Sequence, residues 1–308
     1  MRAKALLIAA VVVVLAAAAP SPAAADGRDY AAAAYGGLAS WIDAYDRGPW
    51  DQPERTVARL ARRGVATLFV QTSNYRLPGP IHRPAALARL LAAAEAHGIQ
   101  TVAWYLPGLD NPWRDWRRVE AAVTHVTPEG HSFDGFALDI EATAVRDIGL
   151  RNRRVLELSR RLRALVGEGA SLGAIVPDPV TQRYWPRFPY RRVRALYDAF
   201  LPMSYWTYRV RGSGAVYRYT RETLRLLRAR TGDPSVPIHP IGGIANRASI
   251  AEVRSFAQAA ADFGAAGASL YDAPITSAAQ WRELGRIAPP IPEPEPVPVP
   301  VTASGSSR

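Results

Sequence analysis

Eight short apolar runs alternate with amphipathic segments along this chain, and that alternation restricts the fold more than any other feature. The pattern is typical of βα units around a parallel sheet. Eight such units within residues 26–288 predict a single (β/α)8 TIM barrel, a fold of about 250 residues. The predicted strands are Gly37–Asp43, Thr67–Thr72, Thr101–Leu106, Gly135–Asp139, Ser171–Val176, Ala199–Tyr205, Ile238–Gly242 and Gly267–Tyr271.

Several of the intervening segments carry helix signals. Proline suits the first helical turn, apolar side chains at helical spacing mark a buried face, and Ser-x-x-Glu forms a capping box. These signals are Pro53, Pro84, the segment Asn152–Val166, Ser249 with Glu252, and Ser277.

An open, doubly wound sheet is the alternative fold. It usually has a glycine-rich phosphate loop directly after its first strand. Gly36 and Gly37 stand before that strand instead, which favours the closed barrel. Gly242 and Gly243 after the seventh strand are a weak candidate for a phosphate loop, because no further glycines and no lysine are near them.

The fourth predicted strand ends in two acids, in the segment Phe133–Glu141. Because successive strand side chains point to opposite faces, Ala137, Asp139 and Glu141 share one face. In a barrel this face points inward, and two carboxylates at its mouth predict a catalytic site, since burying them is costly without a purpose or partner. The alternative is that Asp139 caps the next helix and Glu141 pairs with an arginine. The residues of the opposite face, expected against the helices, are Phe136, Leu138 and Ile140.

Acidic and aromatic residues also stand at the carboxyl ends of the other predicted strands, where the active sites of such barrels lie. Aromatic rings stack on the C–H surfaces of sugars, while carboxylates and amides hold sugar hydroxyl groups. The sequence therefore predicts a sugar-binding rim. Beyond the fourth strand its residues are Trp41, Asp43, Gln71, Trp104, Tyr105, Asp178, Tyr205, Trp206, Tyr271 and Asp272.

Glycoside hydrolysis requires a protonated acid beside the leaving oxygen and a second group at the anomeric centre. Partial burial and the like charge of Asp139 would raise the pKa of Glu141, which suits Glu141 to act as that acid near neutral pH. No metal or other cofactor is expected. The five histidines lack metal-ligand spacing, and the chain has no cysteine for thiolate-metal or redox chemistry. A serine triad also fits poorly, because no Gly-x-Ser-x-Gly elbow occurs.

The segment from Asp134 to Glu141 is similar to the Asp-Gly-x-Asp-x-Asp-x-Glu signature of family 18 glycoside hydrolases, the chitinase-like barrels. This resemblance implies that Glu141 is the general acid and that Asp139 orients a substrate acetamido group, which attacks the anomeric carbon. Met203-Ser-Tyr205 resembles the Met-x-Tyr segment of the family, whose tyrosine assists the acetamido group. Ala137 departs from the signature, since it replaces the middle Asp.

Two further resemblances concern other barrels. Asp139-Ile-Glu141 resembles the fourth-strand Asp-x-Glu of family 25 lysozymes, which cut the glycan of bacterial walls, and Trp41-Ile-Asp43 could supply their first-strand Asp. The domain as a whole is similar to secreted actinobacterial glycosidase-like barrel proteins, which implies the fold but no activity. The segments that carry this similarity are Trp41–Asp43, Trp104–Gly108, Phe133–Glu141, Leu172–Val176, Leu201–Trp206, His239–Ile244 and Ser269–Asp272.

The two ends of the chain differ from the predicted domain. Residues 1–25 have a basic start, an apolar run and a small-residue exit, which predict a signal peptide cleaved near Ala25. An uncleaved membrane anchor is the alternative, but the apolar run Ala5–Ala19 is shorter than the about 20 residues of a spanning helix. Residues 289–308 predict a Pro-rich, disordered tail. We therefore expect a secreted protein, free or associated with the cell wall, without membrane contact after cleavage.

The net charge of +11 comes mainly from arginine. Such a surface favours anionic partners such as cell-wall polymers, although solvated arginines on outer helices are the simpler alternative. No nucleic-acid partner is expected, because no aromatic stripe interleaves the arginines. The sequence thus predicts a glycoside hydrolase-like protein that acts on an extracellular or cell-wall poly- or oligosaccharide. The rivals are a non-catalytic carbohydrate-binding barrel, which Ala137 supports, and a phosphodiesterase, which would need metal ligands.

Overall fold

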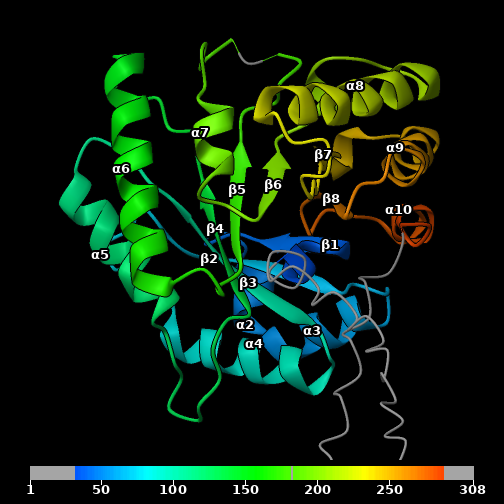
Figure 1. Cartoon of the computed structure of the whole chain (residues 1–308). Coiled ribbons are helices and arrows are strands. Elements are labelled where there is room, and N and C mark those ends of the chain that lie inside the picture. The colour runs from blue at the N-terminus through cyan, green and yellow to red at the C-terminus, as the bar shows by residue number, and fades with distance from the viewer. Residues whose placement is uncertain (1–31, 182, 288–308) are drawn as a thin grey trace, which may run out of the picture.

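Eight parallel strands form the centre of the molecule (Figure 1). The computed structural model describes residues 32–181 and 183–287, so the predicted signal peptide and Pro-rich tail lie outside the described residues. The strands are β1 (Gly37–Ile42), β2 (Thr67–Asn74), β3 (Gln100–Leu106), β4 (Gly135–Asp139), β5 (Leu172–Val176), β6 (Ala199–Pro202), β7 (Ile241–Ile244) and β8 (Gly267–Tyr271).

The strands pair in the order β6-β5-β4-β3-β2-β1-β8-β7. Two isolated parallel bridges, Phe200 with Ile238 and Met203 with Ile241, join β6 to the seventh strand and close the ring. Helices surround the strands in Figure 1. The predicted (β/α)8 barrel is confirmed.

Four helices start where the sequence signals place them, whereas the helix predicted over Asn152–Val166 begins four residues earlier, at Ile148. Pro53 and Pro84 occupy first-turn positions, and Ser249 and Ser277 each cap a helix through a complete capping box. No helix in the two described ranges is both long enough and apolar enough to cross a membrane. The α-helices are α2 (Arg47–Asp51), α3 (Pro53–Ala61), α4 (Pro84–Ala96), α5 (Pro112–Val123), α6 (Ile148–Val166), α7 (Tyr190–Arg194), α8 (Ser213–Thr231), α9 (Ile250–Asp262) and α10 (Ala278–Leu284), and the 3-10 helices are η1 (Ala33–Tyr35), η2 (Trp206–Tyr208) and η3 (Ala245–Arg247).

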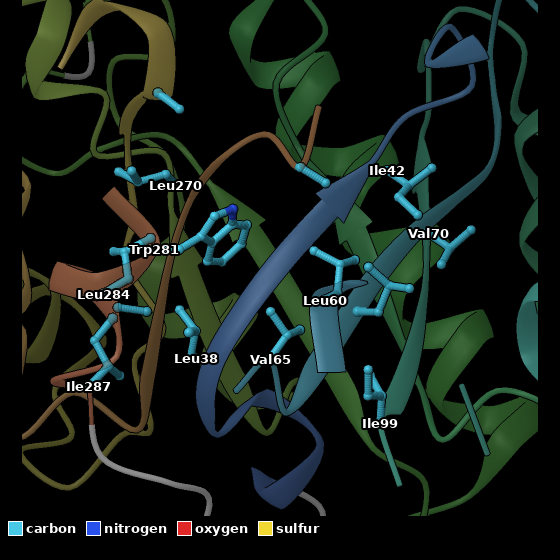
Figure 2. Close-up of a cluster of buried hydrophobic side chains, with 14 of the residues drawn as sticks. Leu38, Ile42, Leu60, Val65, Val70, Ile99, Leu270, Trp281, Leu284 and Ile287 are labelled. Carbon is cyan, nitrogen blue, oxygen red and sulfur yellow. The ribbon is translucent and has the colours of Figure 1, made fainter. Parts of the chain in front are cut away.

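Alternation along the strands divides the apolar core into a layer inside the barrel and a layer between strands and helices. Figure 2 shows part of the outer layer, where Leu38 and Ile42 of β1 lie among Leu60 of α3 and Trp281 of α10. On β4 and directly after it, the outer layer holds the side chains of Phe136, Leu138 and Ile140. Ala137 belongs to the inner layer. The predicted faces of β4 are therefore correct, and Asp139 continues the inward face.

Two strands differ in extent from the prediction because of proline. β6 ends at Pro202, three residues before the predicted end, and β7 begins only after Pro240. Proline has no N–H to donate to a neighbouring strand. Ile238 therefore contributes one isolated bridge to Phe200 instead of a continuous ladder.

The glycine pair in β7 permits close packing of large side chains. A Cβ atom on Gly242 would overlap Cζ3 of Trp206 and lie 2.9 Å from Cζ of Phe256. Figure 1 shows α9, which carries Phe256, beside this strand. Gly242 therefore leaves room for two aromatic rings. This packing accounts for a glycine at position 242, and no phosphate-binding role is needed to explain it.

We expect Gly242→Ala to lower the free energy of unfolding by about 1–3 kcal/mol, because the methyl group overpacks a filled core. Urea unfolding of the purified protein measures this change. Gly48→Ala is the matched control, since nothing lies within 4 Å of the Cβ it adds, and its effect should stay within about 0.5 kcal/mol. Equal stabilities of the two variants would contradict the packing role of Gly242.

Candidate functional site

An open cleft of about 530 Å³ lies at the carboxyl ends of the strands. This volume falls within the range of about 300–1,000 Å³ that is usual for ligand sites. The cleft brings together residues from the ends of β1, β2, β3, β4, β6, β7 and β8, as expected for a barrel site. The predicted residues that line it are Asp43, Gln71, Trp104, Asp139, Glu141, Tyr205 and Tyr271.

The two acids of the fourth strand form one wall of the cleft. Asp139 ends β4, and Glu141 follows on the same inward face. The side chain of Asp139 is 6 % exposed, and its Oδ1 has no hydrogen-bond partner among the described residues. A buried carboxylate oxygen without a partner is costly, so it requires a reason outside the fold itself.

Burial changes the proton affinity of both acids. Burial raises the pKa of Glu141, because a charged carboxylate loses hydration. Burial also raises the pKa of Asp139 well above its usual value, and the charge of Glu141 adds to that rise. The two carboxyl groups therefore hold a proton more tightly than free acids do, which is the property that a general acid needs.

Tyr205 lies near this pair, in the loop after β6. Burial raises the pKa of its phenol, and the charges of Glu141 and Asp139 raise it further. Tyr205 therefore remains a neutral hydrogen-bond donor over the working pH range of most enzymes. Its ring meets that of Tyr271 edge-on, with the centroids 6.3 Å apart.

The wall formed by β1 and β8 is held by hydrogen bonds. Tyr271 donates its hydroxyl to Oδ2 of Asp43 at 2.8 Å, and the backbone N–H of Tyr45 donates to Oδ1 at 2.6 Å. Gln71 fixes the same loop by accepting a bond from the N–H of Ala44 at 2.9 Å. The carboxylate of Asp43 is thereby fixed in position at the cleft.

Trp41 lies beneath the cleft and does not line it. Its indole stacks on Phe69 with ring centroids 4.1 Å apart and meets Trp104 edge-on at 5.8 Å. The indole N–H donates to Oγ of Ser269 at 2.8 Å. Trp41 therefore supports Trp104, which does line the cleft, and it is not a surface for stacking sugars.

Three residues predicted at the rim point away from the cleft, and the prediction that they line it is wrong. Tyr105 follows Trp104 on β3, so it faces outward, and its hydroxyl donates to Asp115 at 2.7 Å. Trp206 packs on Phe256 in the outer core. Asp178 accepts hydrogen bonds from Tyr219 and Thr223 of α8.

Asp272 is also absent from the cleft wall. It follows β8 at the same rim, where its carboxyl group lies beside those of Asp43 and Asp46. Asp272 therefore lies at the predicted rim beside Asp43, but it does not line the cleft as predicted.

Sequence reasoning missed several residues of the cleft. β2 runs two residues beyond its predicted end, to Asn74, and this extension carries the next residues into the wall. The strand continues through Ser73 and Asn74 after a register shift against β3, which apolar periodicity does not reveal. The additional lining residues are Tyr45, Asn74, Tyr75, Arg76, Leu106, Ala142, Thr143, Tyr208 and Ile244.

The raised pKa of Asp139 leads to a prediction for stability. An unfolded aspartate titrates near about pH 3.9, so the folded protein loses stability as the pH rises from there through the higher folded pKa. Asn carries no charge, and Asp139→Asn should therefore melt a few degrees above the wild type at about pH 8. The difference should vanish below about pH 3, where Asp139 is protonated in both states.

Melting curves across this pH range test the prediction, with the exposed Asp51→Asn as control. A lower melting temperature of Asp139→Asn at the higher pH would mean that favourable bonds hold the carboxylate of Asp139.

No protein-family model and no curated protein matches the chain. Its fold is nevertheless shared with solved barrels. A family 18 chitinase from Cycas revoluta in complex with (GlcNAc)3 is 12 % identical, with a TM-score of 0.59 over 81 % of this chain and 98 % of that one. The spore cortex-lytic enzyme SleL of Bacillus cereus is 11 % identical, with a TM-score of 0.59 over 82 % and 74 % of the two chains.

An endo-1,4-beta-mannanase from Rhizomucor miehei is 7 % identical, with a TM-score of 0.59 over 77 % of this chain and 86 % of that one. At these identities the similarities show the fold alone. The resemblances to family 25 lysozymes and to secreted actinobacterial barrels stay predictions. The structure is a TIM barrel, and its structural neighbours include chitinases and other glycoside hydrolases.

Proposed function

We propose that this protein is a secreted glycoside hydrolase that cuts an extracellular or cell-wall glycan, with Glu141 as its general acid. The observation that carries the proposal is the pair formed by the buried Asp139 and the half-buried Glu141, which both lie in the wall of an open cleft and have raised pKa values. A protonated Glu141 would deliver its proton to the leaving glycosidic oxygen. The fold shared with a chitinase and a cortex-lytic enzyme supports this reaction class.

The second chemical role falls to Asp139 together with Tyr205. The unpartnered Oδ1 of Asp139 is available to accept a hydrogen bond from an acetamido N–H, and the neutral phenol of Tyr205 is available to donate one. Both groups would then orient the acetamido oxygen toward the anomeric carbon. The rival is direct attack by a carboxylate, for which Asp43 is the candidate because two hydrogen bonds hold it at the same cleft.

Secretion is part of the proposal, and it rests on the pattern of residues 1–25. The absence of cysteine means that the domain needs no disulfide to fold outside the cell. An extracellular location would bring the cleft into contact with wall glycans.

The deciding experiment incubates the purified protein with N-acetylated chitin oligomers, peptidoglycan, mannan and de-N-acetylated oligomers of the same lengths. Product masses identify any bond that is cut. With acetamido participation, N-acetylated substrates are turned over and their de-N-acetylated counterparts are not. Cleavage of both would favour Asp43 as the second group. The proposal fails if no glycan in this panel is hydrolysed.

A non-catalytic carbohydrate-binding barrel is the second candidate. Ala137 favours it, because this buried residue inside the barrel stands where the family 18 signature has its middle acid. Calorimetric titration separates the two candidates. Saturable binding of a glycan without any product would support the binding barrel.

A further inference from the structure

Three aspartates gather at the rim beside the cleft, although they come from opposite ends of the chain. Asp43 follows β1, Asp46 precedes α2, and Asp272 follows β8. Each offers one carboxylate oxygen, and these three oxygens lie within 4.8 Å of one another. Oxygens bound to one Ca²⁺ at about 2.4 Å cannot lie farther apart than about 4.8 Å. The spacing therefore fits a shared calcium ion.

One carboxylate oxygen of Asp272 is buried and unpartnered. Asp272 is 7 % exposed, and its Oδ1 has no hydrogen-bond partner among the described residues. None of the ion pairs between described residues includes Asp43, Asp46 or Asp272. A buried, unpaired carboxylate within a group of like charges is unfavourable unless a cation or a proton compensates it.

The loop that carries two of the aspartates is already ordered. Oδ2 of Asp46 accepts a hydrogen bond from the N–H of Asp43 at 2.9 Å, and Asp43 is in turn bonded to Tyr45 and Tyr271. Asp43 and Asp46 are half-buried, so water can reach the cluster from the open side. Calcium accepts six to eight oxygen ligands, including waters, in flexible geometry, whereas magnesium demands shorter distances and a near-ideal octahedron.

We propose that Asp43, Asp46 and Asp272 form a calcium site that fastens the loop after β1 to the end of β8. The proposal goes beyond glycan hydrolysis, because it concerns a metal and because the proposed acid Glu141 and its partners Asp139 and Tyr205 are not among the ligands. Since Asp43 and Tyr271 also line the cleft, the ion would hold that wall in place.

Calcium binding to the full chain is measured without any glycan, so its outcome is independent of hydrolytic activity. Titration calorimetry with CaCl₂ should give a dissociation constant on the order of 10⁻⁴ M, as in extracellular calcium modules. At a hundredfold excess over that constant, the melting temperature should rise by on the order of 5 °C.

Terbium luminescence locates the site. The indole N–H of Trp50 donates to the carbonyl of Asp43 at 2.6 Å, which places a sensitising ring beside the cluster. Excitation of tryptophan should produce terbium emission, and excess Ca²⁺ should abolish it.

Asp46→Asn and Asp272→Asn should each weaken calcium binding at least about tenfold, because each removes a charged ligand. Asp51→Asn makes the same chemical change at an exposed residue of α2, which pairs with Arg83, and should bind as the wild type does. Asp46 is half-buried, so its variant keeps the test open if Asp272→Asn does not fold. The proposal is overturned if the wild type binds no calcium at millimolar concentrations, or if all three variants bind it equally.

Discussion

Replacing Glu141 by glutamine is expected to reduce kcat for glycan hydrolysis by about 10²–10⁴-fold, the usual contribution of general acid catalysis. Glutamine keeps the shape of the side chain but has no proton to deliver to the leaving oxygen. Because burial raises the pKa of Glu141, the wild type should retain its protonated acid at a higher pH than a free glutamate would. Initial rates with the best substrate of the oligomer panel measure the effect.

The glutamine variant should still bind glycan, since only the proton is lost. Titration of Glu141→Gln with the same oligomer should give a dissociation constant close to that of the wild type. Glu129→Gln is the matched control, because Glu129 is exposed in the loop before β4 and away from the cleft lining. Full activity of Glu141→Gln would remove the central residue of the proposed mechanism.

The second large effect concerns stability, and it comes from a buried ion pair at the end of the barrel opposite to the cleft. Nη2 of Arg163 on α6 donates to Oδ2 of Asp198 at 2.8 Å, and both side chains are less than a tenth exposed. Oδ2 of Asp198 also accepts the N–H of Leu172 at 2.8 Å, so the pair ties α6 to the first residue of β5. Asp198→Asn leaves the charge of Arg163 buried without its counterion.

We expect Asp198→Asn to lower the free energy of unfolding by about 3–5 kcal/mol, because a buried charge that loses its partner keeps its desolvation cost. For a domain of this size the melting temperature should fall by roughly 10 °C. Glu222→Gln is the control, since it breaks an exposed pair with Arg225 and exposed pairs contribute little. If both variants lost a similar free energy of unfolding, burial would not make the Arg163–Asp198 pair more important for stability than an exposed pair.

The sequence by itself determined the barrel and the two acids of the fourth strand. Local patterns suffice there, because a buried strand alternates its side chains between two environments and a helix end needs a cap. The alternation in Phe133–Glu141 correctly predicted that Ala137 faces the interior and that Phe136 and Leu138 face the helices. The position of Asp139 and Glu141 in one cleft followed from that alternation and from the barrel.

Only the tertiary structure decided which other rim residues reach the cleft. Trp104 and Tyr105 are adjacent in the sequence, yet one lines the cleft and the other bonds to Asp115 behind the strand. Asp178 turns toward α8, because Tyr219 and Thr223 of that helix offer it hydroxyl donors. Such outcomes depend on where a strand ends and on which helix packs behind it. The group of Asp43, Asp46 and Asp272 likewise exists only because the last strand, β8, pairs with the first strand, β1. That contact joins distant segments, and no local pattern encodes it.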